Sequence, residues 1–274
     1  MIEARSVDVR LGAHLALSSV SVRLTPGRSV AIIGRNAAGK TTLLRTLAGL
    51  LEPDAGVVLW EGRPPSRWSA RDRARSVAYV AQRSSLSERF SVAETVELGR
   101  YALAPAPQRV ETALRAFGLE TLARRPYHDL SVGQQQRVAL ARAWAQVDPT
   151  GVLLLDEPFA AMDLAETDRT LRLLDAHRSA GGTAVIVVHD LTLAASFADE
   201  AWLLEGGRLV AAETSDAIFL PERLAPHFGV PFERDARGRP VPIVGQGGGA
   251  VVFGAAPRSA GAVDRSGGSD AGNR

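Results

Sequence analysis

The chain has no cysteine, which excludes disulfide bonds and thiolate metal sites. It is also short of lysine: lysine and arginine together number 32, yet Lys40 is the only lysine. No apolar run approaches the roughly 20 residues that a membrane-spanning helix needs, and the N-terminus lacks the apolar core of a signal peptide. We therefore expect a soluble globular chain, in which the single lysine needs an explanation.

The charge balance argues against a nucleic-acid partner. The 274 residues carry a formal net charge of only +2, although the sequence pI is about 9.5. With no cysteine, 3 tyrosines and one lysine, few groups titrate between neutrality and high pH, so the pI exaggerates the positive field. We therefore expect no nucleic acid among the partners. The length suits one large α/β domain or two small ones.

Three short apolar runs predict buried strands, and a helical pattern follows each of them. The runs lack polar interruption, which suits strands covered on both faces, as in a parallel sheet. The predicted strands are Ser29–Ile33, Gly151–Leu155 and Thr183–Val188. The predicted helices are residues 40–50, Leu164–Ser179 and Leu191–Ala198. This alternation predicts an α/β core.

The rest of the chain divides into several further segments. Met1–Arg23 shows alternating short strands and predicts an antiparallel unit beside the core, and residues 84–147 predict a helical insert. Phe219–Gly229 predicts a last helix, and Val230–Val244 predicts a small strand pair. Residues 245–274 are rich in Gly, Ala, Ser and Asp, which predicts a disordered tail.

The stretch GRNAAGKTT follows the first predicted strand and has the P-loop pattern, GxxxxGK and then Thr. Glycines let backbone N–H groups wrap a polyanion, and the next helix adds its positive N-terminal end. A slim lysine reaches the β- and γ-phosphates, whereas a wide arginine fork does not fit such a loop, and this explains the single lysine. The alternative, a turn that merely joins strand to helix, leaves the lysine unexplained. The predicted nucleotide-binding residues are Gly34, Arg35, Asn36, Ala37, Ala38, Gly39, Lys40, Thr41 and Thr42.

Two carboxylates, Asp156 and Glu157, end the second predicted strand before Pro158. Adjacent side chains on a strand point to opposite faces, so the pair must separate where the strand ends. Asp156 can bind Mg²⁺ together with the Thr41 hydroxyl. Glu157 faces the space where a water would attack the γ-phosphate, and it can act as a general base. The alternative is an acidic turn before proline.

The stretch LSVGQQQR, Leu130–Arg137, precedes a long helical pattern. Ser131 and Gln134 have the spacing of a capping box, which alone would be structural. The stretch also resembles LSGGQ, the signature of the ATP-binding cassette (ABC) family. The P-loop, this signature, the two carboxylates and a downstream histidine follow one another in the order of that family. The resemblance covers residues 1–244 and predicts an ABC ATP-binding domain.

The resemblance implies a fold, cofactors and site residues. The implied fold is an α/β P-loop NTPase with a RecA-like core, an N-terminal antiparallel β subdomain and an α-helical subdomain at about residues 84–147. ATP and Mg²⁺ are the implied cofactors. The implied catalytic residues are Glu157, His189 and Gln82, and the implied metal ligands are Thr41, Gln82 and Asp156. Ser131 and Gly133 are implied to contact the γ-phosphate of a nucleotide bound by a second copy, and Asp163 is implied to cross the dimer interface. Gln134 and Asp163 are also implied to be nucleotide-binding residues.

The resemblance also implies the partners. Two copies of the chain would form a homodimer around two ATP molecules, which ATP closes and hydrolysis opens. One cassette without a membrane span implies a peripheral subunit at the cytoplasmic face of the inner membrane. It would drive separate permease subunits, with a solute-binding protein as an indirect partner. Phe90–Tyr101 and residues 228–241 resemble importers of ferric siderophores, haem and cobalamin. We therefore expect uptake of such a solute; an importer of another metal or small solute and a non-transport ABC switch protein are the alternatives.

Five positions depart from the pattern of the family, and Leu11 is the fifth, after the four given next. Ala37 and Val132 replace glycines, and Ala160 and Met162 replace Ser and Leu. The Ala37 methyl group is tolerable if its φ is negative and costly otherwise. None of the four changes removes a residue that performs hydrolysis, so we expect an active ATPase. The alternative is a nucleotide-gated module with little hydrolysis.

The aromatic residue that stacks on adenine in the family is absent, because Leu11 occupies its place and no Phe, Tyr or Trp precedes Trp60. We expect Leu11 or the Arg10 guanidinium to cover the base, with loose nucleotide discrimination. The remaining histidines show no metal-ligand spacing and are interpreted as ordinary residues: His14, His128, His177 and His227.

Overall fold

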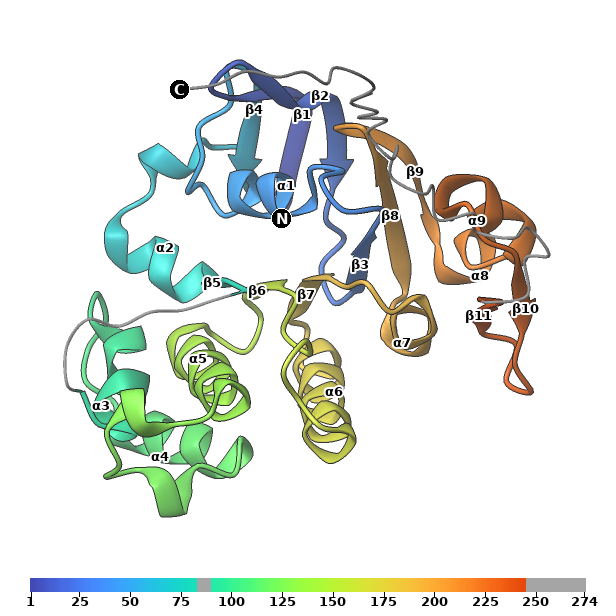
Figure 1. The fold of residues 1–274 in the computed structure, drawn as a ribbon. Coiled ribbons are helices and arrows are strands. Elements are labelled where there is room, and N and C mark those ends of the chain that lie inside the picture. The colour runs from blue at the N-terminus through green and yellow to red at the C-terminus, as the bar shows by residue number, and fades with distance from the viewer. Residues whose placement is uncertain (83–89, 245–274) are drawn as a thin grey trace, which may run out of the picture. The chain divides into compact units, whose positions relative to one another are not determined.

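The computed structural model describes residues 1–82 and 90–244, and within it Met1–Ile243 pack as one unit (Figure 1). The predicted tail, 245–274, and the first residues of the predicted helical insert, 84–89, lie outside the described residues. No helix in the described ranges is long and apolar enough to cross a bilayer.

A six-stranded sheet forms the centre of this unit. Its strand order is β5 (Val77–Val80), β6 (Val152–Asp156), β7 (Thr183–Val187), β3 (Ser29–Ile33), β8 (Glu200–Glu205) and β9 (Arg208–Thr214). The first five strands run parallel, and β9 is antiparallel to β8. The three predicted strands are confirmed as β3, β6 and β7, which lie side by side. The other strands of this sheet are not among those predicted from the sequence.

Alternate residues of the middle strands enter two different cores, which is why these strands have no polar interruption. In β6, Leu154 packs into one core, while Leu153 and Leu155 pack into the core on the opposite face. In β7, Val185 faces the first core and Ile186 the second. Each fully buried leucine, valine or isoleucine stabilises the fold by about 1.5–3 kcal/mol.

The first core is shared with an antiparallel sheet of strand order β2 (His14–Arg23), β1 (Ile2–Leu11) and β4 (Ala55–Trp60). Helix α1 (Lys40–Leu47) lies between the two sheets (Figure 1) and contacts β1, β2, β6 and β7. The Trp60 indole N–H donates to the Leu47 carbonyl at 3.0 Å and so satisfies an acceptor at the end of α1. The predicted antiparallel unit is confirmed, but its strands β1 and β2 are long, with 10 residues each, and β4 is an additional strand.

Residues 90–147 contain helices and no strand, as predicted. The helices are α3 (Val92–Glu97), α4 (Pro107–Ala116) and α5 (Val132–Gln146), with 3₁₀ turns at Leu98–Arg100, Glu120–Leu122 and Tyr127–Asp129. They cover β5 and β6 on the face opposite α1. Arg100 donates to the Ala145 carbonyl at 2.9 Å, and Arg109 donates to the Val147 carbonyl. Two cations thus stabilise the negative C-terminal end of α5.

The elements that remain follow β6, β7 and β9 or precede β5. They are α6 (Leu164–Ser179), α7 (Leu191–Phe197), α8 (Ser215–Ile218), α9 (Pro221–Phe228), β10 (Phe232–Arg234) and β11 (Pro240–Pro242), together with a 3₁₀ turn at Pro65–Arg67 and α2 (Ala70–Ser76). Side chains of α7, α8 and α9 form a third core with β3 and β8. The predicted helices, including the last one, and the predicted strand pair are confirmed.

His177 of α6 connects this helix to the loops that lead into β6 and β7. Its Nε2 lies 3.0 Å from the Gly151 carbonyl oxygen, and its ring centroid lies 5.6 Å from that of Trp144. A Cβ at Gly182 would lie 2.3 Å from Nε2, so the ring fits only beside glycine. Burial lowers the pKa of His177 from its ordinary value of 6.5, and hydrogen bonds with the backbone of Gly151 and Thr183 act in the opposite direction.

We predict that His177 makes the fold less stable in weak acid. The unfolded chain binds a proton at His177 below about pH 6.5, whereas the folded chain does so only at lower pH. The free energy of unfolding therefore falls as the pH drops below that value, by at most about 1.4 kcal/mol per pH unit. In thermal melts between about pH 7.5 and 5.5, His177→Gln should show a flatter decline of Tm than the parent chain. The exposed His128→Gln control should keep the parent slope; an unchanged slope in His177→Gln would contradict the prediction.

Candidate active site

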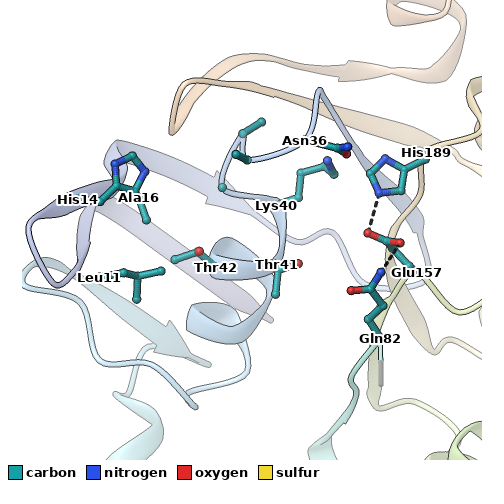
Figure 2. Close-up of a pocket in the computed structure, with 13 residues that line it drawn as sticks. Leu11, His14, Ala16, Asn36, Lys40, Thr41, Thr42, Gln82, Glu157 and His189 are labelled. Carbon is teal, nitrogen blue, oxygen red and sulfur yellow. Dashed lines mark hydrogen bonds and ion pairs between the residues drawn. The ribbon is translucent and has the colours of Figure 1, made fainter. Parts of the chain in front are cut away.

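A cavity of about 820 Å³ opens between the P-loop, the ends of β5, β6 and β7, and the hairpin of β1 and β2 (Figure 2). Most of its lining was predicted from the sequence: residues 36–42 of the P-loop, Gln82, Glu157, His189 and Leu11. His14 and Ala16 complete the lining and were not predicted.

Two glycines let the P-loop, residues 34–42, pass between strands β2 and β8. Gly34 has a φ of 144°, and a Cβ there would lie 2.2 Å from the Leu204 carbonyl oxygen. Gly39 has a φ of 97°, and a Cβ there would lie 2.6 Å from the Ala16 carbonyl oxygen. Both positions therefore exclude every side chain, and the loop backbone packs directly on backbone.

Lys40 begins α1, and its side chain turns back over the P-loop. Its Nζ donates to the carbonyl oxygens of Gly34 and Arg35, both at 2.9 Å. Burial lowers the pKa of Lys40, and the carboxylates of Glu157 and Asp156 act in the opposite direction. An ammonium group has three donors, so one N–H remains for a phosphate oxygen at the mouth of the loop.

Two residues that line the cavity have strained backbones. Ala37 has a φ of 61° and Glu157 a φ of 50°, both in the left-handed region that disfavours residues with a Cβ. Because φ is positive at Ala37, its methyl group costs roughly 1–2 kcal/mol at this position. Glycine would escape that cost.

Asp156 and Thr41 form an oxygen-rich pair beside the P-loop. The Thr41 hydroxyl donates to Asp156 Oδ1 at 3.1 Å, and the Tyr79 hydroxyl hydrogen-bonds to the same carboxylate. Burial raises the pKa of Asp156, and burial and the Asp156 charge raise the pKa of Tyr79 to about 12. Tyr79 was not predicted as a site residue; its strand β5 pairs with β6, which ends at Asp156.

The donor set of this pair fits Mg²⁺, which prefers hydroxyl, carboxylate and phosphate oxygens. Within the ranges that the structure describes, no group of three or more His, Cys, Asp or Glu residues could hold a metal by itself. An ion beside Thr41 and Asp156 would therefore complete its shell with phosphate oxygens and water, as Mg²⁺ does in nucleotide sites.

Glu157 lies between His189 and Gln82 (Figure 2). His189 Nε2 is 2.6 Å from Glu157 Oε1, and Gln82 Nε2 donates to Glu157 Oε2 at 2.8 Å. Gln82 follows β5, Glu157 follows β6 and His189 follows β7. These three strands are parallel neighbours, so their carboxyl ends meet at one edge of the sheet. The structure therefore brings together all three residues that the sequence indicates as catalytic. The two contacts fix the orientation of the carboxylate.

The signature residues lie outside the cavity of their own chain. Ser131 and Gln134 form the predicted capping box at the start of α5, and the Asp163 side chain accepts from the Glu166 N–H at the start of α6. A Cβ at Gly133 would lie 2.4 Å from the Ala161 carbonyl oxygen, so this glycine lets α5 approach the loop before α6. Val132, next to it, is 70% exposed. None of the four predicted residues lines the cavity.

The end of the cavity away from Glu157 is formed by the β1–β2 hairpin. Leu11 lines it, as expected, whereas Arg10 is not part of the lining. His14 also lines the cavity, a position that the sequence did not predict for it. The sequence feature that could have placed His14 beside Leu11 is the hairpin. The two residues pair across a turn in which Gly12 has a φ of 62°.

Comparison with known proteins agrees with this geometry. The family model described as ABC transporter matches residues 17–160, which is more than half of the chain. The chain belongs to the ABC transporter family. The matched range includes the capping box that resembles LSGGQ. The predicted fold, an ABC nucleotide-binding domain with an antiparallel N-terminal β subdomain, is confirmed.

Relatives and solved structures cover most of this ABC domain. The hemin import ATP-binding protein HmuV of Pseudomonas entomophila (strain L48) is 39% identical over 237 residues, which is 84% of this chain and 93% of that protein. HmuV of Streptomyces coelicolor is 39% identical over 236 residues, 84% of each chain. The dimeric, post-hydrolysis ATP-binding cassette MJ0796 with bound ADP and Pi has a TM-score of 0.71 and 27% identity, and the match covers 78% of this chain and 99% of that chain.

We predict that Ala37→Gly stabilises the protein. Removal of the methyl group relieves roughly 1–2 kcal/mol of left-handed strain, and glycine costs about 0.5–1 kcal/mol of chain entropy. The free energy of unfolding in urea should therefore rise by about 0.5–1 kcal/mol. The matched control is Ala38→Gly, because Ala38 is buried and has no positive φ; it should lose about 1 kcal/mol. A loss of stability in Ala37→Gly would contradict the strain argument.

Proposed function

We propose that the chain is the ATP-hydrolysing subunit of an importer and powers the uptake of haem through a separate membrane permease. ATP hydrolysis is supported by one observation: His189, Glu157 and Gln82 form a hydrogen-bonded group at the P-loop cavity. The choice of haem is supported by the relatives, which are named as hemin import ATP-binding proteins. An importer of a siderophore, cobalamin, another metal or a small solute is the alternative.

The triphosphate binds on the P-loop. Backbone N–H groups of residues 34–42 and the N-terminal end of α1 face the phosphate oxygens, and the free N–H of Lys40 neutralises charge between the β- and γ-phosphates. Thr41, Asp156 and Gln82 would hold Mg²⁺, which would supply further charge neutralisation on the phosphates. Tyr79 keeps the Asp156 carboxylate in place through its hydroxyl.

Hydrolysis needs a base beside the γ-phosphate. Glu157 accepts a proton from the attacking water as the oxygen bonds to phosphorus, and the bond to the ADP oxygen breaks on the opposite side. His189 and Gln82 hold one carboxylate oxygen each, so the base is oriented before the water arrives. A carboxylate that rotated freely would spend part of its time pointing away from the water.

The remaining predicted residues serve a second copy of the chain. Ser131, Gly133, Gln134 and Asp163 lie outside their own cavity, and in a head-to-tail homodimer they would complete the cavity of the partner. The dimeric cassette MJ0796 supports this arrangement. Val132 is exposed on the same helix terminus and would lie in the dimer interface.

The permease docks on the helical side of the domain. A cavity of about 340 Å³ there is lined by Leu98, Tyr101, Leu103 and neighbouring residues, and Tyr101 is 91% exposed. A large exposed aromatic beside an apolar hollow is typical of a protein-binding surface. The chain would then sit at the cytoplasmic face of the inner membrane, and a solute-binding protein would deliver haem from the other side.

We predict that Glu157→Gln lowers the ATPase kcat about 10²–10⁴-fold while ATP binding is retained, because the amide cannot accept the proton. The exposed Glu120→Gln is the control and should leave kcat unchanged. Steady-state phosphate release measures the first effect, and equilibrium ATP binding measures the second. A parent chain without steady-state hydrolysis would instead favour a nucleotide-gated module.

The same Glu157→Gln chain, held in its ATP-bound state, tests the transport part of the proposal. Tagged protein with ATP should capture a polytopic permease from native membranes, together with a haem-binding protein. Capture of a permease with a binding protein for another solute would support the importer function but contradict haem as the transported solute. Capture of soluble protein or nucleic acid alone would contradict the transport function.

A further inference from the structure

The two ends of the active-site cavity differ in chemistry. Figure 2 shows Glu157, His189 and Gln82 on one side of Lys40, and Leu11 and His14 on the other. The first end carries the charged and amide groups suited to a reacting phosphate. The second end, on the β1–β2 hairpin, carries an aliphatic side chain and an imidazole ring. A triphosphate on the P-loop with its γ-phosphate near Glu157 therefore extends its nucleoside toward the hairpin.

Leu11 and His14 form one surface on that hairpin. They are directly paired across the antiparallel ladder, and paired residues project from the same face of a sheet. Leu11 is 48% exposed, which leaves a large apolar side chain open to the cavity. His14 is also exposed, and among the residues that the structure describes its ring has no hydrogen-bond or ion-pair partner. Both side chains are thus free to contact a ligand.

We propose that His14 stacks on the nucleobase, with Leu11 packed beside it, and that this pair determines base selectivity. The inference rests on the proposed ATPase function. An imidazole ring offers a flat π face to any base, and a leucine offers apolar surface. A stacked side chain contacts the face of a base and not the hydrogen-bonding edge that distinguishes adenine from guanine. Of the three hairpin residues in the lining, only His14 carries polar side-chain atoms. ATP and GTP should therefore bind with similar affinity, within about tenfold of each other.

The test is equilibrium binding of ATP, GTP and inorganic tripolyphosphate to the full chain and its variants. His14→Ala should weaken ATP and GTP about fivefold or more, the range expected for loss of one stacking contact, and leave tripolyphosphate unchanged. His14→Phe should restore nucleotide affinity, because phenylalanine stacks but has no polar atom. The control is His128→Ala, at an exposed histidine that does not line the cavity, which should bind all three ligands like the parent.

Several results would overturn the assignment. Unchanged ATP affinity in His14→Ala, or an equal loss for tripolyphosphate, would remove His14 from the base subsite. Failure of His14→Phe to restore binding would show that a ring nitrogen and not stacking is required. An ATP affinity far above that for GTP would contradict selectivity by stacking alone. A parent chain that binds neither ATP nor tripolyphosphate would overturn the proposed function itself, and this result is distinguishable from the others.

Discussion

The contact of the P-loop backbone with two carbonyl oxygens is the constraint on which the site depends. The Leu204 oxygen on one side and the Ala16 oxygen on the other leave room only for Gly34 and Gly39. One carbonyl belongs to the central sheet and the other to the N-terminal antiparallel sheet, so the loop has this shape only when both sheets are in place. Helix α1, packed between the sheets, then sets the position of Lys40 at its first residue.

The parallel sheet supplies the second requirement of the chemistry, a cluster of side chains from distant parts of the sequence. The residues after β5, β6 and β7 meet at one edge, and there Gln82, Glu157 and His189 form hydrogen bonds across separations of 75 and 32 residues. The positive φ of Glu157 is part of this arrangement, since the chain leaves the strand direction at that residue. Strain at one residue thus accompanies the orientation of the base.

Features that depend on neighbouring residues could be predicted from the sequence. The buried strands, the capping box at Ser131 and the P-loop follow from local patterns, and the family resemblance indicated the catalytic residues. Features that depend on pairing across the chain could not. The sign of φ at Ala37, the contact of Tyr79 with Asp156 and the place of His14 in the cavity all depend on which strands lie side by side. A partly polar strand such as β9, at the sheet edge, lacks the apolar run that marks the middle strands.

The central claim is that the P-loop accepts lysine and no wider cation, and ATP binding to Lys40→Arg tests it most directly. The Lys40 Nζ lies between two loop carbonyls at 2.9 Å, where a planar guanidinium has no room. We predict that Lys40→Arg keeps its circular dichroism spectrum and loses at least about tenfold in ATP affinity. The reverse exchange at an exposed site on the same helix, Arg45→Lys, should leave affinity unchanged. Parent-like ATP affinity in Lys40→Arg would contradict the account.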